Sequence, residues 1–487
     1  MSETLVETQE GLYINGQWRP GENGHVEVMD PTTEEIVGTV AEATAQDAAE
    51  AAAAARAAQP GWAAMKPERR AEIFTRVAHL VTERADMLIE LTMREGGFTR
   101  AMAGGFGARA NEWFTTAAEA TVRNLDVSTP PQLTPKPDGT VELLNGQIQR
   151  RPAGVVAALI PFNGPLFGAS MKSAQALAMG NTVVLKPAPQ NPLAVIELFK
   201  IFEEAGMPPG VANLVTASDP EVGATLTRSR DVDLVSFTGS TAVGRAVYAA
   251  GSQTMKRMVL ELGGKGACIV FEDADLEAAV KGISNTWTVN TGQICSAPTR
   301  AIVHRSVYEE VLERLEAVAR AVPVGSPFDP DTVAGPVISG AQRQRIETLV
   351  DSARGEGASI AAGGTRPDID RGFFVAPTLI ANCTNQMRVA REEIFGPVVS
   401  VIPFSTQDEA VAIANDSDFG LSSYIYSRDT ARAYQVAGQL QAGTIQINTT
   451  SMKLDLPRGG VKMSGIGREG GQAGLEEMTE LHCVVWS

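Results

Sequence analysis

Residues 153–250 alternate short apolar segments with helix-forming ones, and this alternation constrains the fold more than any other feature of the chain. Residues 155–161 and 182–186 are typical of buried strands, and helical patterns follow each of them. The rhythm continues through residues 211–215, 234–237 and 243–250. Strands that alternate with helices predict a parallel sheet with helices on both faces, which binds its ligands at the carboxyl ends of its strands.

A second α/β series begins near Ala267. Its expected strands are 300–304, 373–379, 398–404, 424–427 and 444–448. Because 487 residues exceed what one compact core usually holds, we expect an α/β protein with a Rossmann-like cofactor-binding domain, a second α/β catalytic domain and a small β arm for oligomerisation. The expected division is 1–125 and 152–260 for the first domain, 261–460 for the second, and 126–151 with 470–487 for the arm.

The segments before the first sheet have helical patterns. Residues 41–58 predict a helix that ends near Pro60, and residues 68–95 and 105–122 predict two more. Residues 126–151 contain several prolines and a strand-like stretch at 141–148. They predict an extended hairpin that projects from the body, or alternatively a plain surface loop.

Composition excludes several classes of protein. The chain has 41 Lys and Arg against 57 Asp and Glu, a net charge of −16, so no basic face for nucleic acid is expected. No apolar run reaches about 18 residues, which argues against a membrane span. The amino terminus lacks a targeting pattern, so a cytoplasmic location is expected. The four cysteines and four histidines are scattered, so we expect neither disulfides nor a metal.

Cys295 is the cysteine most suited to chemistry. It lies in a loop, Thr-Gly-Gln-Ile-Cys-Ser-Ala-Pro, whereas Cys268 and Cys483 lie in apolar segments and Cys383 lies in a polar turn. A loop thiol is either a reactive nucleophile or a structural residue, and the residues around it leave both open. A nucleophilic thiol needs activation by a base or by dipoles.

Glu261 and residues 235–244 are two further candidates. Glu261 stands between two leucines, where desolvation would raise its pKa towards that of a general base, although pairing with Lys265 or Arg257 explains it equally well. Residues 235–244 read as strand, Gly-Ser-Thr turn and helix, and the amino end of such a helix can hold a pyrophosphate.

Seven motifs in one order resemble the aldehyde dehydrogenase superfamily, and the resemblance covers nearly the whole chain from Tyr13. The motifs are Pro161-Phe162-Asn163-Gly164-Pro165, Lys186-Pro187-Ala188-Pro189, Phe237-Thr238-Gly239-Ser240, Leu260-Glu261-Leu262-Gly263-Gly264-Lys265, Gly292-Gln293-Ile294-Cys295, Glu392-Glu393-Ile394-Phe395-Gly396-Pro397 and Pro457-Arg458-Gly459-Gly460. The resemblance implies oxidation of an aldehyde to a carboxylic acid with NAD or NADP, in a homodimer or homotetramer.

The resemblance also implies a role for each catalytic residue. Cys295 would attack the aldehyde to form a thiohemiacetal, and Asn163 with the Cys295 backbone N–H would stabilise the oxyanion. Transfer of hydride would leave a thioester, which water activated by Glu261 would hydrolyse. Lys172 and Glu469 would relay protons away from the base.

Eight residues correspond to the family's cofactor site. They are Phe162, Lys186, Pro189, Gly239, Ser240, Gly244, Glu393 and Phe395. Many relatives have Glu where this chain has Pro189, and that Glu binds the adenosine ribose. Proline accepts no such hydrogen bond and carries no charge to repel a 2′-phosphate, so NADP is as plausible as NAD.

The expected aldehyde tunnel departs from the family pattern at two positions. Its expected lining is Phe167, Met171, Ile294, Ser296 and Arg458. Gly164 replaces a bulkier residue beside Asn163, which would widen the tunnel. Arg458 replaces a Phe, and its guanidinium either binds the carboxylate of a semialdehyde or pairs with Asp455.

Three other functions compete with hydrolytic aldehyde oxidation. A CoA-acylating dehydrogenase often lacks the glutamate base that is present here as Glu261. An inactive structural or binding relative often loses the nucleophile, which is present as Cys295. A thiol hydrolase without a cofactor leaves the strand-turn-helix at Gly239 unexplained.

Overall fold

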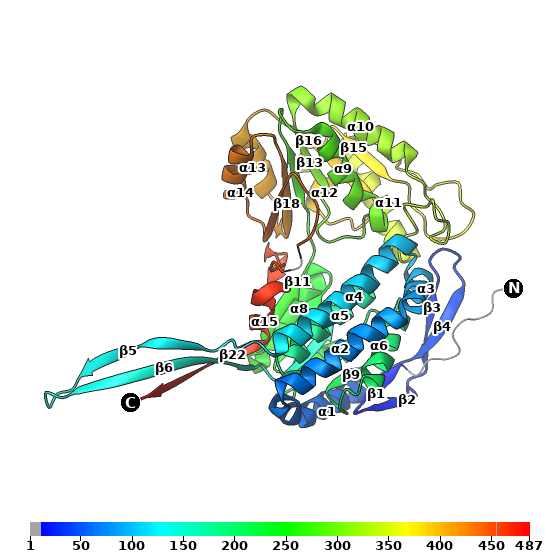
Figure 1. Ribbon diagram of the computed structural model, residues 1–487. Coiled ribbons are helices and arrows are strands. Elements are labelled where there is room, and N and C mark those ends of the chain that lie inside the picture. The colour runs from blue at the N-terminus through cyan, green and yellow to red at the C-terminus, as the bar shows by residue number, and fades with distance from the viewer. Residues whose placement is uncertain (1–10, 454) are drawn as a thin grey trace.

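Two α/β bodies and a projecting β arm make up the computed structural model, which describes residues 11–453 and 455–487 (Figure 1). Among these residues, no helix is both long and apolar enough to cross a membrane. The predicted fold class, with two parallel-sheet α/β domains, is confirmed.

The first body is built on an eight-stranded sheet. In spatial order its strands are β2 (Gln17–Arg19), β1 (Leu12–Ile14), β9 (Ala212–Leu214), β8 (Thr182–Lys186), β7 (Val155–Leu159), β10 (Leu234–Thr238), β11 (Arg257–Glu261) and β21 (Gly465–Ile466). The five strands from β9 to β11 pair in parallel, and the strands outside them are antiparallel. All five residues of β7 are buried, as expected of a strand covered on both faces.

Strand order in this sheet reverses beside β7. The chain runs outwards from β7 through β8 to β9, then returns to place β10 and β11 on the other side of β7. Open parallel sheets bind ligands at the carboxyl ends of strands at such a reversal. The polar loops after β7, β8, β10 and β11 therefore meet at the edge where a ligand is expected.

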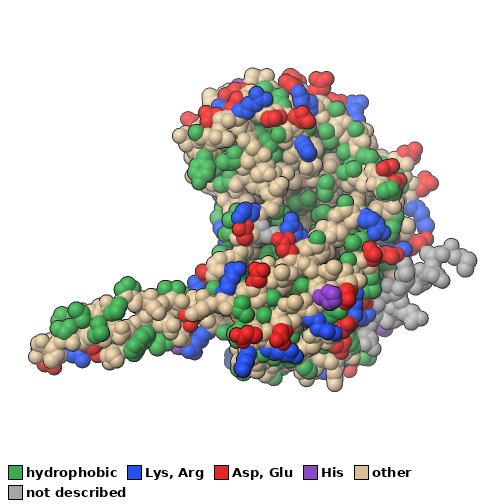
Figure 2. Space-filling view, in the orientation of Figure 1, with side chains coloured by type: hydrophobic (Ala, Val, Ile, Leu, Met, Phe, Trp, Pro, Cys, Tyr) green, Lys and Arg blue, Asp and Glu red, His purple; other side chains and the backbone are tan. Residues whose placement is uncertain are grey.

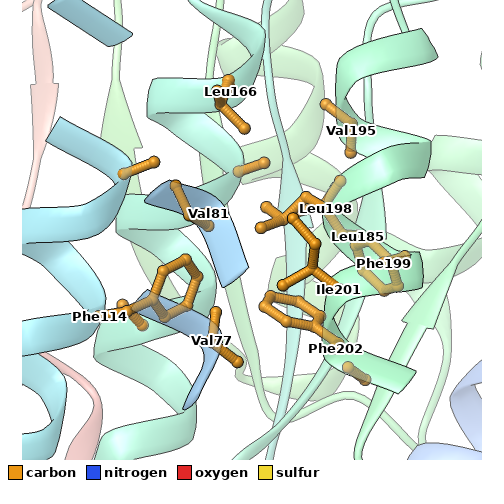
Figure 3. Packing of buried hydrophobic residues seen from close by; sticks show 14 of the residues in the cluster. Val77, Val81, Phe114, Leu166, Leu185, Val195, Leu198, Phe199, Ile201 and Phe202 are labelled. Atoms are coloured by element: carbon orange, nitrogen blue, oxygen red, sulfur yellow. The ribbon is translucent and has the colours of Figure 1, made fainter. Parts of the chain in front are cut away.

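Helices cover both faces of the sheet. On one face lie α1 (Ala45–Ala64), α7 (Pro220–Arg228) and α8 (Thr241–Gly251). On the other lie α5 (Pro165–Ala178) and α6 (Leu193–Glu204), covered in turn by α2 (Pro67–Glu83), α3 (Ala85–Gly96) and α4 (Arg100–Thr121). Figure 3 shows the core on this second face, where Val77, Phe114 and Phe202 converge on Leu185 of β8.

All three helices predicted before the first sheet have different bounds, and the one expected over 105–122 begins earlier, at Arg100. The helix expected to end near Pro60 continues to Ala64, because Trp62 is buried and its Nε1 donates a hydrogen bond to the carbonyl of Leu177 (3.0 Å). The helix expected over 68–95 is broken at Arg84 into α2 and α3. The break lets the buried face of α3, with Leu88 and Met93, pack on α4 and α6.

The second body is built on a seven-stranded sheet. Its order is β14 (Ser359–Ala362), β15 (Thr378–Ala381), β16 (Val398–Phe404), β13 (Arg300–His304), β12 (Ala267–Val270), β18 (Ser422–Tyr426) and β19 (Thr444–Ile447). Its helices are α9 (Leu276–Trp287), α10 (Tyr308–Ala321), α11 (Gly340–Gly355), α12 (Arg388–Arg391), α13 (Gln407–Asn415) and α14 (Thr430–Ala437). The strand expected over 373–379 starts only at Thr378, after Pro377, whose nitrogen has no proton for a strand ladder.

A direct link joins the two sheets. β11 ends at Glu261, and residues 262–266 lead into β12 at Ala267. The carboxyl edge of the first sheet therefore faces the amino edge of the second. Figure 2 shows the surface hollowed between the two bodies.

The arm contains β5 (Val127–Pro135), β6 (Val141–Pro152) and β22 (Thr479–Trp486) in an antiparallel sheet that extends far from the body (Figure 1). All of residues 470–487 were expected to belong to the arm, but only part of this segment does. Residues Gly471–Glu477 form α15, which buries Leu475 against the first body and packs on α5. Strand β21 of the first sheet lies in 461–469, a stretch that the expected division left unassigned.

Four short strands complete the structure in two antiparallel pairs. They are β3 (His25–Met29) with β4 (Ile36–Ala41), and β17 (Phe419–Gly420) with β20 (Val461–Lys462). Three single-turn helices are η1 (Ser252–Thr254), η2 (Val289–Gly292) and η3 (Arg305–Val307). Of these, η2 leads directly into the loop that carries Cys295.

Candidate active site

Loops from both bodies meet in the hollow between them. The Asn163 side-chain amide, after β7, donates to the carbonyl of Gln293 (3.1 Å), two residues before Cys295. The backbone N–H of Gly264, after β11, donates to the Glu393 carboxylate (3.0 Å). These contacts bring together the segments of Asn163, Glu261, Cys295 and Glu393, which lie far apart in the sequence.

The loop before Cys295 is held in an unusual conformation. Asn290, Thr291 and Gly292 all have positive φ (52°, 51° and 67°), which non-glycine residues rarely adopt. A β-carbon on Gly292 would lie 2.1 Å from the carbonyl oxygen of Gly396, so only glycine fits there. Such backbone strain concentrates at functional sites, where surrounding structure enforces it.

Contacts on both sides fix the Cys295 loop. The side chain of Gln293 is buried, and its amide oxygen accepts a hydrogen bond from the N–H of Ile338 (3.0 Å). The carbonyl of Ser296 accepts hydrogen bonds from the hydroxyls of Ser422 (2.8 Å) and Tyr424 (2.7 Å). The thiol between these anchors is therefore presented in a defined position.

Cys295 differs from the other three cysteines. Cys268 and Cys383 are buried and Cys483 is exposed on β22, whereas Cys295 is partly exposed. The thiol nevertheless lies deep in the hollow. Burial there, together with the nearby carboxylates of Glu261 and Glu393, raises the pKa of Cys295 to about 12. The thiol is therefore protonated at rest, and its ionisation needs help from other groups.

Glu261 has the environment of a general base. Its side chain is 9% exposed, and among the described residues its Oε1 has no hydrogen-bond partner. Burial and the neighbouring Glu469 raise the pKa of Glu261 to about 8, against the opposing charges of Lys172, Arg458 and Arg468. A carboxyl group that titrates near neutral pH can both take and give a proton.

Lys172, Glu469 and Ser236 form a buried polar cluster behind Glu261. The Lys172 ammonium bonds both the Glu469 carboxylate and the Ser236 hydroxyl (2.8 Å to Ser236), and that hydroxyl donates to Glu469 (3.2 Å). Lys172 and Glu469 form the pair expected from the sequence, whereas Ser236 was not expected there. A serine inside an apolar strand gives no sequence signal of its own.

The carboxyl edge of the first sheet has groups suited to a dinucleotide. The exposed Ser240 caps α8, and its hydroxyl accepts a hydrogen bond from the N–H of Val243 (3.4 Å), so the positive end of the helix faces the hollow. The Lys186 amine donates to the carbonyl of Ala217 (2.7 Å), and burial lowers the pKa of Lys186 to about 8. Pro189, three residues later, is partly exposed.

Glu393 and two phenylalanines also lie at the carboxyl edge of the first sheet. The carboxylate of Glu393 packs so closely on Gly263 that a β-carbon there would lie 2.4 Å from it. Burial raises the pKa of Glu393. The rings of Phe162 and Phe395 meet edge to face with centroids 5.7 Å apart. A carboxylate and two aromatic rings are suited to a ribose and a planar ring.

The two glycines of the 235–244 motif have different positions. The backbone N–H of Gly239 bonds the carbonyl of Glu261 (3.0 Å), which ties the turn after β10 to the end of β11. Gly244, which the sequence analysis assigned to the cofactor, is buried, and a β-carbon on it would lie 2.3 Å from the Leu262 side chain. Gly244 therefore allows α8 to approach the residues after β11 and does not line the hollow.

Arg458 reaches the hollow from the loop before β20 and has aromatic neighbours. Its guanidinium lies over the rings of Phe167 (5.3 Å to the centroid) and Trp113 (5.8 Å). Asp455 is exposed and paired with Lys453, so the predicted alternative of an Arg458–Asp455 pair is not formed. Met171 is buried nearby on α5, and Ile294 and Ser296 are partly exposed beside Cys295.

Helix α4 contributes to this side of the hollow, which the sequence analysis missed. Trp113 contacts Phe167 edge to face (6.3 Å between centroids). Phe106 fills the space beside Gly164, where a β-carbon would lie 3.5 Å from the Phe106 ring. Both residues follow the helical spacing typical of core positions, so no sequence pattern distinguished them from ordinary packing.

Comparison with known proteins gives one consistent result. The family model for the aldehyde dehydrogenase family matches residues 18–484. A 3-succinoylsemialdehyde-pyridine dehydrogenase from a Pseudomonas species is 40% identical over 478 residues, which cover 97% of this chain and 98% of the relative. A betaine aldehyde dehydrogenase from Bacillus subtilis is 38% identical over 481 residues, which cover 97% and 96%.

Solved structures agree with the sequence comparisons. The crystal structure of betaine aldehyde dehydrogenase from Staphylococcus aureus in complex with NAD+ superposes with a TM-score of 0.94. It is 36% identical to this chain, and the match covers 98% of this chain and 95% of that one.

Proposed function

The chain belongs to the aldehyde dehydrogenase family, and on that premise we propose that Cys295 and Glu261 carry out its oxidation of an aldehyde to a carboxylic acid. The enzyme is an oxidoreductase that uses NAD or NADP. The observation that carries the proposal is Glu261, a buried carboxylate without a partner among the described residues, which shares the hollow with the partly exposed thiol of Cys295.

The first step is addition of the Cys295 thiolate to the aldehyde carbon. The sulfur–carbon bond forms as the carbonyl π bond breaks, and the oxygen of the resulting thiohemiacetal takes up the negative charge. The Asn163 amide donates towards the Cys295 loop. Together with the Cys295 backbone N–H, it stabilises this oxygen by hydrogen bonding.

The second step converts the thiohemiacetal to a thioester. When bound, the nicotinamide group supplies the two-electron acceptor for this oxidation. Lys186 and the amino end of α8 with Ser240 hold the adenosine and pyrophosphate parts of the cofactor, and Glu393 holds the nicotinamide ribose, beside Phe162 and Phe395. These roles are supported by the positions of the residues: Phe162, Lys186 and Ser240 follow strands of the first sheet, and Glu393 and Phe395 reach its carboxyl edge from the second body.

The third step hydrolyses the thioester. Glu261 takes a proton from water as the oxygen attacks the acyl carbon, and the sulfur–carbon bond then breaks to release the acid and the Cys295 thiolate. Lys172 and Glu469 relay this proton away from Glu261: the Glu469 carboxylate accepts it, and the Lys172 ammonium holds that carboxylate by a hydrogen bond. Support comes from the electrostatic coupling of Glu261 with this buried pair.

Two alternatives fit the residues less well. A CoA-acylating enzyme transfers the acyl group to a thiol and has no use for a base that titrates near neutral pH, as Glu261 does. An inactive relative has no need of a strained backbone that holds a cysteine beside such a base. Hydrolytic oxidation therefore accounts for more of the observed features.

Turnover of a panel of aldehydes with NAD+ and NADP+, followed by absorbance of the reduced cofactor, tests the proposal. The expected products are reduced cofactor and the carboxylic acid in equal amounts without added CoA. Cys483→Ser, which changes an exposed cysteine on the arm, serves as the matched control for Cys295→Ser. Turnover that depends on CoA, or that survives in Cys295→Ser, would contradict the proposed mechanism.

A further inference from the structure

The guanidinium of Arg458 is shielded but lacks an anionic partner. Its Nη2 atom is buried, and among the residues that the structure describes no acceptor bonds it and no carboxylate forms an ion pair with it. The Arg458 backbone exchanges two hydrogen bonds with Glu469 (2.6 and 2.8 Å), so the residue is firmly anchored. A cation that is removed from water without a partner is costly, so such a group is suited to bind an anion.

Nearby carboxylates are engaged elsewhere. Glu469 binds Lys172 and Ser236, and Asp455 pairs with Lys453. Glu261 is the base of the proposed mechanism. Arg109 lies close enough to add to the positive potential at Arg458, and its own partner is Glu112 (2.7 Å). No carboxylate among the described residues is therefore left to pair with Arg458, which points to a ligand as the source of its acceptor.

Aromatic rings orient the guanidinium. Phe167 and Trp113 each present a face to it, with the guanidinium carbon 5.3 and 5.8 Å from the two centroids. The rings supply cation–π attraction and keep water away, but neither supplies an anion. The Nη2 donor remains free for a carboxylate, which a planar guanidinium binds with two parallel hydrogen bonds.

Arg458 shares the hollow with the reacting groups. Its charge is coupled to Glu261 and to the Cys295 thiol. Phe167, on which the guanidinium lies, follows Asn163 by one helical turn at the start of α5. A substrate whose aldehyde reaches Cys295 therefore extends towards Arg458.

Resting on the proposed function, we propose that Arg458 determines specificity by binding a carboxylate at the far end of the substrate, so that the enzyme prefers ω-carboxyaldehydes. Several relatives are named for betaine aldehyde, a quaternary ammonium aldehyde. Aromatic faces commonly bind such cations. Here Arg458 already covers Phe167 and Trp113 and repels a second cation, so betaine aldehyde is disfavoured.

Comparison of matched aldehydes in wild type and Arg458 variants tests the inference. The probes are ω-carboxyaldehydes of increasing length, n-alkanals of equal length, and betaine aldehyde. Wild type should favour the best ω-carboxyaldehyde over its alkanal by roughly tenfold to a hundredfold in kcat/KM, as expected for a charge-assisted contact. Arg458→Met should bring this ratio close to unity and improve kcat/KM for betaine aldehyde. Arg458→Lys should keep part of the preference for the ω-carboxyaldehyde.

A binding measurement separates recognition from turnover. The dicarboxylate product of the best substrate should raise the melting temperature of wild type with cofactor, and it should do so far less in Arg458→Met. Asp455→Asn is the control, because it removes a charge from the same loop that does not contact Arg458. It should leave both the kcat/KM ratio and dicarboxylate binding as in wild type. Arg458→Gln replaces Arg458→Met where the latter does not fold.

Two outcomes distinguish failure of the inference from failure of the proposed function. Equal kcat/KM values for carboxylated and apolar aldehydes in wild type, or a ratio unchanged in Arg458→Met, overturn the role of Arg458 and leave aldehyde oxidation intact. Lack of turnover with every aldehyde contradicts the proposed function. In that case dicarboxylate binding that is equal in wild type and Arg458→Met overturns the role of Arg458 as well.

Discussion

Two regions of the molecule differ in the groups that they leave without contacts. One is the hollow between the two bodies, and the other is the β arm. In the hollow, two buried polar atoms lack partners among the described residues, namely Glu261 Oε1 and Arg458 Nη2. In the arm, apolar side chains face solvent, with Leu133 68% and Val485 66% exposed. Figure 2 shows hydrophobic side chains gathered along the arm.

The contrast indicates what each region binds. Buried polar atoms without partners are costly, so the hollow is suited to small molecules that carry charge and hydrogen-bonding groups. Exposed apolar strands are costly in a different way, because they favour pairing with another chain. We therefore expect the arm to bind a second copy of this chain, in a homodimer or homotetramer, and the following changes test each side of the contrast.

Loss of the nucleophile should have the largest effect. Cys295→Ala should lower kcat by about a thousandfold or more, since no covalent intermediate can form, while affinity for the cofactor changes little. Steady-state rates and titration of cofactor fluorescence measure the two quantities. Cys483→Ala on the arm should behave as wild type in both. Retention of half the turnover in Cys295→Ala would assign the nucleophile elsewhere.

Loss of the base should slow only hydrolysis. Glu261→Gln should lower steady-state turnover by about a hundredfold or more, with a burst of reduced cofactor and accumulation of acyl-Cys295. Rapid quenching with mass spectrometry detects the thioester. A folded, slow variant that shows neither burst nor thioester would exclude Glu261 from the hydrolytic step.

The pH dependence of wild type should report the same group. Because burial raises the pKa of Glu261 to about 8, activity should rise with pH through about 8 as the base ionises. The raised pKa also means that Glu261 stabilises the fold fully below its ordinary value near 4.5, and that this contribution is lost as pH rises through about 8. Glu261→Gln should therefore show no rise in activity with pH. Its free energy of unfolding should also fall less than that of wild type as the pH rises. A wild-type activity profile that is flat between roughly pH 6 and 9 would contradict the first statement. A free energy of unfolding that does not fall as the pH rises would contradict the second.

Charges on the arm should alter assembly without altering chemistry. Leu481 and Val485 lie on one face of β22 and are both exposed. Leu481→Lys with Val485→Lys should yield a smaller assembly by light scattering, because buried charges destabilise an interface. Tyr434→Lys, at an apolar side chain of α14 that is 78% exposed, is the control. An unchanged mass in the arm variant would remove the arm from the interface.

The choice between NAD+ and NADP+ should show the smallest effect. Pro189→Glu adds a carboxylate near Lys186, where it can bind ribose hydroxyls and repel a phosphate. The ratio of kcat/KM for NAD+ to that for NADP+ should rise by about tenfold, or roughly 1.4 kcal/mol. Gln190→Glu, at the exposed neighbouring position, should change the ratio much less. A wild-type preference for NAD+ that is already above about a thousandfold would contradict the significance given to Pro189.

Much of the fold was predictable because apolar periodicity is a local property. Strands such as β8 have the bounds that the sequence predicted. The predictions were wrong where distant contacts override local signals, as at Pro60, where burial of Trp62 extends α1, and at 470–487, where Leu475 draws α15 onto the body.

For the site, the sequence identified candidate residues but not the partners of their side chains. Motif order identified candidates such as Cys295 and Glu261, and the structure brings their segments to one hollow. Sequence spacing could not choose between Asp455 and a substrate as the partner of Arg458, because it contains no information on where the side chains point. Trp113 and Ser236 were missed because their spacing and surroundings match those of core residues.

The link of residues 262–266 has a consequence for the separation of the reacting groups. Glu261 is carried by the last parallel strand of the first body, and Cys295 is carried by a loop of the second body that leads into β13. A change in the angle between the bodies therefore alters the separation of base and nucleophile without distorting either sheet. The hydrogen bonds that cross the hollow, from Asn163 to Gln293 and from Gly264 to Glu393, hold that angle and with it the separation of the two reacting groups.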